Sequence, residues 1–76
     1  MFSQEKFSGR LKQLRKERKL TLVEFSQILG VSKQTPCRWE NGERQPSLEM
    51  LTRISEFYSV SADYLLGLSD TISSHI

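Results

Sequence analysis

The sequence TLVEFSQILGVSKQTPCRWEN, residues 21–41, predicts two short helices joined by a tight turn. Thr21 and Glu24 have the spacing of a capping box, in which each side chain accepts a hydrogen bond from the other residue's backbone amide at the start of a helix. Gly30 can adopt the left-handed conformation that commonly ends a helix. Ser32 is the predicted N-cap of the second helix, which runs to the end of this stretch.

Apolar residues at helical spacing predict three further helices on either side of this stretch. The first covers about residues 4–18, the fourth follows the N-cap Ser47, and the fifth covers residues 62–66 after the N-cap Ser61. No segment alternates apolar and polar residues between turns, as a half-buried strand does. The predicted fold class is therefore all-α, a five-helix bundle containing a helix-turn-helix. The apolar stripes comprise Phe7, Leu11 and Leu14; Phe25, Ile28 and Leu29; and Leu48, Leu51, Ile54 and Tyr58.

The length of 76 residues fits one domain, which we place at residues 5–68, with residues 69–76 as a flexible tail. Cys37 is the only cysteine, so an intrachain disulfide is excluded. No apolar run is long enough to cross a membrane, and the N-terminus lacks the apolar segment of a signal peptide. These features predict a cytoplasmic protein without a membrane partner.

The charge is distributed unevenly along the chain. Residues 1–44 carry ten basic and five acidic side chains, a net charge of +5, whereas residues 45–76 carry one basic and four acidic side chains, a net charge of −3. A basic half attracts an anionic partner such as DNA. The alternative is that the basic residues of the first helix form a solvated face with no partner. Charge alone leaves both interpretations open.

No pattern in the sequence predicts an enzyme. It has no Ser/His/Asp set, no paired carboxylates placed for acid–base chemistry, no metal-ligand spacing and no phosphate-binding glycine loop. We therefore expect no catalytic residues, no metal site and no cofactor.

Four segments in this order resemble the Cro/lambda-repressor-like helix-turn-helix family, also called the XRE family. They are RLKQLRKERKLT (10–21), LGVSKQT (29–35), RWENGERQPSLEML (38–51) and VSADYLLG (60–67). The resemblance covers nearly the whole predicted domain, and the ordered combination is far more specific than any one segment. It implies that the third helix is a recognition helix, which enters the major groove of double-stranded DNA.

The resemblance also implies roles for individual residues. Positions expected to contact bases are Lys33, Gln34, Cys37 and Arg38. Positions expected close to phosphates are Thr35, Asn41 and Arg44. Arg15 and Glu40 match positions that form an ion pair between the first helix and the end of the recognition helix. A bidentate, partly buried pair would orient that helix, whereas an exposed pair would contribute little.

Three residues depart from the family pattern. Pro36 stands where the family usually has a branched apolar residue, and it removes one early hydrogen bond of the recognition helix. We therefore expect that helix to form with a distorted or later start. Leu22 replaces a glutamine that often binds a phosphate. Lys19 replaces a common glycine, so its turn needs a left-handed conformation at higher cost or a different geometry.

The expected function is that of a stand-alone transcriptional regulator, a repressor that binds a pseudo-palindromic operator as a homodimer. The fifth helix, with Leu65 and Leu66, is a candidate dimer interface. The alternative is a protein-binding module in which the third helix no longer contacts DNA, a reading that Pro36 and Leu22 motivate. A protein partner such as a toxin remains open, as do the operator sequence and the target genes.

Overall fold

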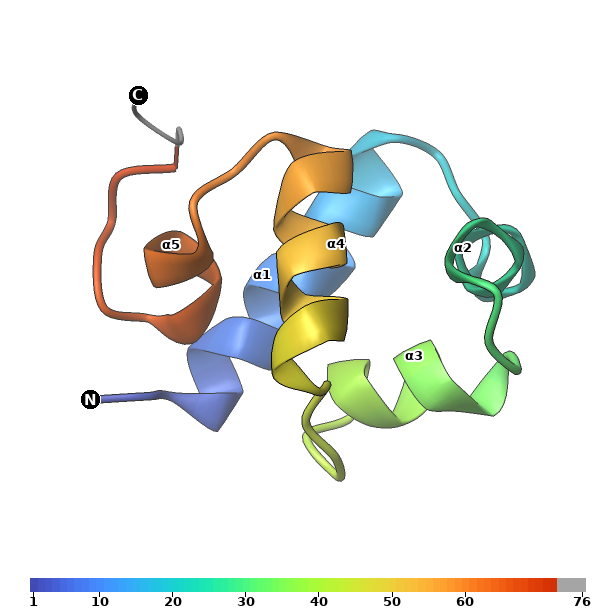
Figure 1. Cartoon of the computed structure of the whole chain (residues 1–76), viewed down its shortest axis with the longest axis horizontal. Coiled ribbons are helices and arrows are strands. Elements are labelled where there is room, and N and C mark those ends of the chain that lie inside the picture. Colours follow the sequence, from blue (N-terminus) through green and yellow to red (C-terminus); the bar gives the residue numbers. More distant parts are fainter. Residues whose placement is uncertain (73–76) are drawn as a thin grey trace.

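The computed structural model describes residues 1–72, and residues 73–76 of the predicted tail lie outside the described part. The described residues form five helices and no strand, so the predicted all-α bundle is confirmed. In Figure 1, α4 lies at the centre in front of α1, with α5 on one side and with α2 and α3 on the other. The helices are α1 (Gln4–Glu17), α2 (Leu22–Leu29), α3 (Gln34–Glu40), α4 (Leu48–Tyr58) and α5 (Ala62–Leu66).

Three of the four predicted N-caps are confirmed. The hydroxyls of Thr21, Ser47 and Ser61 each accept a hydrogen bond from the backbone amide three residues later, and Glu24 completes the capping box of α2. The prediction for Ser32 is wrong, because α3 starts at Gln34 without a side-chain cap. The Ser32 hydroxyl lies 3.2 Å from the hydroxyl of Thr35 instead.

Left-handed residues close both of the turns that flank α2. Gly30 has φ 73° and ends α2 as predicted, where the absence of a Cβ makes this conformation inexpensive. Lys19 has φ 58° in the turn between α1 and α2. The left-handed conformation expected for Lys19 is therefore observed, and its steric cost lowers the stability of the fold.

The core lies between α1, α4 and α5 and extends to α2 and α3. Its fully buried side chains include Phe7, Leu11, Phe25, Ile54 and Leu65. Two residues assigned to apolar stripes are exposed, because Leu48 is 84% and Ile28 is 44% accessible. Each lies on the outer side of its helix, where no neighbouring helix covers it. Leu65 has no accessible surface, so it cannot contribute to a dimer interface as suggested.

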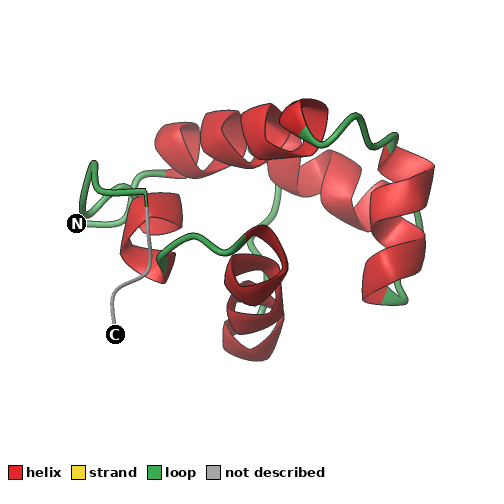
Figure 2. Ribbon diagram, turned by 90° about the horizontal axis from the view of Figure 1, so that it is seen from above, coloured by secondary structure: helices red, strands yellow, loops and turns green. Residues whose placement is uncertain are grey.

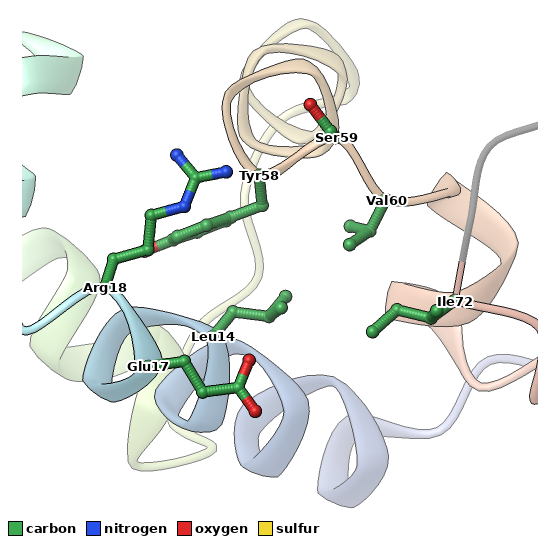
Figure 3. A pocket seen from close by; sticks show the side chains of 7 residues that line it. All are labelled: Leu14, Glu17, Arg18, Tyr58, Ser59, Val60 and Ile72. Carbon is green, nitrogen blue, oxygen red and sulfur yellow. The ribbon is translucent and has the colours of Figure 1, made fainter.

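The segment 69–72, assigned to the flexible tail, packs back onto the helices. Arg10 donates hydrogen bonds to the carbonyl of Ser69 at 2.9 Å and to the carboxylate of Asp70 at 2.8 Å. The Ser61 amide donates to the carbonyl of Ile72 at 2.9 Å. Ile72 thereby lines a surface hollow together with Leu14 (Figure 3). Seen from above, the N-terminus lies at the α5 end of the molecule, away from α2 (Figure 2).

No helix within residues 1–72 is long and apolar enough to cross a membrane.

Tyr58→Phe is expected to raise the free energy of unfolding by about 1 kcal/mol at neutral pH. The Tyr58 hydroxyl is buried and has no hydrogen-bond partner among the described residues, and an unsatisfied buried polar group costs ~1–3 kcal/mol. Burial also raises the pKa of Tyr58, and the nearby Glu40 carboxylate raises it further. The wild-type protein therefore loses stability as the pH rises through the pKa of an unfolded tyrosine, about 10.

Urea unfolding at pH 7 and above about pH 10 measures both effects. The Phe variant should show a smaller alkaline loss of stability than wild type, because position 58 no longer titrates. A variant less stable than wild type at pH 7 would show that the hydroxyl makes a favourable interaction in solution.

Candidate nucleic-acid interface

The outer face of α3 carries exposed polar side chains, and its inner face is apolar. Pro36 is fully buried and Trp39 is nearly so, which anchors the inner face against the core. In Figure 1, α3 lies along the lower edge of the view with no helix below it. Helical spacing places four of the predicted positions on this outer face: Gln34, Arg38 and Asn41, which are exposed, and Cys37, which is half-buried.

The turn between α2 and α3 positions this face. After the left-handed Gly30, the Val31 amide donates to the carbonyl of Ser26 at 3.0 Å and closes the end of α2. Ser26 is buried, and its hydroxyl donates to the Val23 carbonyl of its own helix. The helix α2 crosses α3 steeply (Figure 2).

The start of α3 has adapted to proline. Pro36 is the third residue of the helix, within the first turn, where a backbone amide needs no intrahelical partner. The Ser32 carbonyl accepts from the Thr35 amide at 3.1 Å, and the Cys37 amide donates to the Lys33 carbonyl at 3.4 Å. The helix therefore begins later than a cap at Ser32 would place it. This later start is the one expected from Pro36. Lys33 and Gln34 lie at this start, both exposed.

Pro36→Ala is expected to lower the free energy of unfolding by about 1–2 kcal/mol. The change removes buried ring atoms and raises the conformational entropy of the unfolded chain. Pro46→Ala is the matched control. Pro46 is only half-buried in the loop before α4, so its replacement should cost less than about 1 kcal/mol. Urea unfolding of both variants measures the difference. Equal losses of unfolding free energy in the two variants would indicate that burial of the Pro36 ring does not stabilise the fold.

The end of α3 leads into a loop that carries a second basic side chain. Gly42 has φ 79°, and the Glu43 amide donates to the Arg38 carbonyl at 2.9 Å, which closes the helix. Arg38, Glu43 and Arg44 line a polar surface hollow of about 360 Å³. This loop thus places Arg44 beside Arg38, although the two residues belong to different segments of the chain.

An ion pair between α1 and α3 holds the end of α3. The Arg15 guanidinium donates from Nε and Nη2 to the two carboxylate oxygens of Glu40, at 2.8 and 3.0 Å. The side chains are 11% and 4% accessible, so the pair is largely removed from water. Arg15 also donates to the Leu20 carbonyl at 2.7 Å, which ties the turn before α2 to the same point. The hydrogen bond to Glu40 raises the pKa of Arg15, so its guanidinium stays charged.

The remaining assigned residues lie near this face but in different environments. Thr35 is half-buried and its hydroxyl faces Ser32, so it offers less contact surface than its neighbours. Leu22 is half-buried at the first position of α2. Sequence reasoning missed Ser8 and Gln4 of α1, which hydrogen-bond to the main chain at the end of α3 and in the following loop. The available signal was a serine directly beside the apolar stripe of α1.

Comparison with known proteins decides the family. The helix-turn-helix family model HTH_3 matches residues 11–65. The chain belongs to this helix-turn-helix family. The resemblance to Cro/lambda-repressor-like proteins is thereby confirmed for most of the chain.

Two curated relatives of this helix-turn-helix chain are bacterial or phage regulators. It is 39% identical over 64 residues to the uncharacterized HTH-type transcriptional regulator YobD of Bacillus subtilis, covering 84% of this chain and 57% of YobD. It is 35% identical over 65 residues to the cryptic phage CTXphi transcriptional repressor RstR of Vibrio cholerae, covering 86% of this chain and 59% of RstR. The chain thus spans a little over half the length of these relatives.

A solved structure supports the fold independently of sequence. The SOS-response transcriptional repressor LexA of Eubacterium rectale superimposes with a TM-score of 0.81 at 19% identity, covering 96% of this chain and 78% of that chain. At this identity the likeness extends to the fold alone.

Proposed function

We propose that this chain binds a specific double-stranded DNA sequence through the outer face of α3 and thereby regulates transcription. The observation that carries the proposal is the construction of that face. Exposed polar side chains project from a helix whose inner side is buried, and the Arg15–Glu40 pair fixes its far end. Preorganised side chains on a rigid, protruding helix are what reading of base edges in the major groove requires.

The chemistry of the side chains suggests their roles. Arg38 can donate two hydrogen bonds to O6 and N7 of guanine, and Gln34 can pair with N6 and N7 of adenine. Lys33 lies at the start of the helix, where its ammonium can contact a guanine or a phosphate. Cys37 lies between these residues and offers an apolar contact. Thr35, Asn41 and Arg44 flank the face and are assigned to phosphates, which set register without reading sequence.

We further propose that the protein acts in the bacterial cytoplasm as a repressor and binds as a homodimer. A two-fold-symmetric dimer recognises a pseudo-palindrome with half-sites about 34–36 Å apart, one turn of DNA. A domain of this size buries a small core, so association would also add stability. The similarity to the phage repressor RstR supports repression, since a bound dimer can block a promoter.

Selection from a random pool of double-stranded DNA at near-physiological salt tests the proposal. We expect enrichment of a two-fold-symmetric motif. Weak binding without enrichment, lost as salt rises, would mean that only electrostatic contact to phosphates occurs, and the DNA-reading role would be wrong. A protein partner for the same face would then be the better hypothesis.

A further inference from the structure

A short polar network connects α1 to the main chain at the end of α3. The Ser8 hydroxyl donates to the Trp39 carbonyl at 2.6 Å. The Gln4 side-chain amide donates to the Ser8 hydroxyl at 3.1 Å and to the Arg44 carbonyl at 3.4 Å. These residues lie 31 and 40 positions apart in sequence, so the network joins the first helix to the loop that follows the recognition helix.

The network satisfies a backbone group that the helix itself leaves poorly paired. Trp39 lies in the last turn of α3, where carbonyls lack the usual partner four residues later. Its carbonyl receives only a 3.3 Å bond from Gly42, whereas the Ser8 hydroxyl approaches to 2.6 Å. Ser8 is 8% accessible, so little water competes for this bond. A Cβ on Gly42 would lie 3.8 Å from the Ser8 hydroxyl, so α1 packs directly on this turn.

The network and the ion pair attach the end of α3 to two separate points on α1. Ser8 and Arg15 are seven residues apart on α1, two turns on the same helical face, or about 10.5 Å along the axis. Arg15 binds the side chain of Glu40, and Ser8 binds the main chain that enters the loop. The ion pair holds the last side chain of α3, whereas the network holds the main chain at the same end and at Arg44, so it acts on the loop that the ion pair does not reach.

We propose that Ser8, supported by Gln4, is a positioning residue for DNA binding that sets the main chain of residues 41–44. Through this placement it aims Asn41 and Arg44 at the phosphates beside the recognition helix. The inference rests on the proposed function, because it concerns how the same face contacts DNA. Neither Ser8 nor Gln4 touches DNA in this arrangement, so their effect is transmitted through the loop.

Ser8→Ala, tested with the DNA site that the pool selection provides, should bind that site about five- to tenfold more weakly than wild type, the range a single net hydrogen bond corresponds to. The slope of log affinity against log salt should fall by about one, because one phosphate contact is lost. Ser26→Ala is the matched control, since Ser26 is also a buried helical serine but its hydroxyl bonds only within α2. It should leave the salt slope unchanged.

A double-mutant cycle with Arg44→Ala separates positioning from general loss of stability. If Ser8 acts through Arg44, Ser8→Ala should weaken binding less than about twofold in the Arg44→Ala background. Additive effects with an unchanged salt slope would overturn the proposal. Gln4→Ala, a milder change at the start of α1, should reproduce the direction of these effects if the Ser8 variant folds poorly.

Amide hydrogen exchange distinguishes failure of this inference from failure of the proposed function. Ser8→Ala should speed exchange at Gly42 and Glu43 about tenfold beyond any change in global stability, with or without DNA. Unchanged exchange there would overturn the positioning role even if wild type binds DNA. Faster exchange in a protein that selects no DNA would instead overturn the proposed function.

Discussion

Arg38→Ala is expected to weaken binding of the selected DNA site by about ten- to a hundredfold, since a bidentate arginine–guanine contact is worth ~1–3 kcal/mol. Arg38 is exposed in the middle of the outer face of α3. Its guanidinium has no ion-pair partner among residues 1–72, so it is available to DNA. Discrimination between the four base pairs at one position of the site should decrease at the same time, because no side chain then hydrogen-bonds to that base.

The fold should tolerate this change. The hydrogen bond that closes α3 uses the Arg38 carbonyl, which alanine retains. We therefore expect the free energy of unfolding to change by less than about 0.5 kcal/mol, as is usual at exposed positions. Urea unfolding checks this before affinity is compared.

Arg53→Ala is the matched control, because it removes the same charge from an exposed position on α4. It should weaken binding to all DNA sequences slightly and equally, because it changes only the overall electrostatic attraction between the protein and DNA. Titration of both variants against the selected site and a scrambled site measures the contrast. If Arg38→Ala bound the selected site as well as Arg53→Ala does, the assignment of the recognition face would be wrong.

Glu40→Ala is expected to lower the free energy of unfolding by about 3 kcal/mol, because breaking a largely buried pair leaves one charge without its partner. Arg15 would keep only its bond to the Leu20 carbonyl, in a position where its side chain is 11% accessible. Thermal or urea unfolding measures the loss. A change below about 1 kcal/mol would show that the pair behaves like a solvated surface contact.

Replacing both partners separates stability from positioning. The double variant Arg15→Met/Glu40→Leu leaves no buried charge, so it should recover most of the stability that Glu40→Ala loses. DNA affinity should stay below that of wild type, because the directional bidentate attachment of α3 is gone. Recovery of full affinity would show that apolar packing alone orients the recognition helix.

The local sequence determined most helix boundaries, because caps and turns depend on a few neighbouring residues. Thr21, Ser47 and Ser61 cap their helices as predicted, and Gly30 ends α2. Side-chain oxygens and a glycine act on backbone groups two or three residues away, so sequence alone contains this information. Ser32 failed as a cap because Pro36 shifts the start of α3, where two local preferences conflict.

Only the tertiary structure decided which side chains are covered and which distant groups meet. Leu48 and Ile28 fit their apolar stripes but remain exposed, since helical spacing defines a face and not the helix that covers it. The hydrogen bond from Ser8 to Trp39 and the attachment of residues 69–72 by Arg10 join segments at least 31 positions apart. Such contacts depend on the packing of whole helices, which no local pattern specifies.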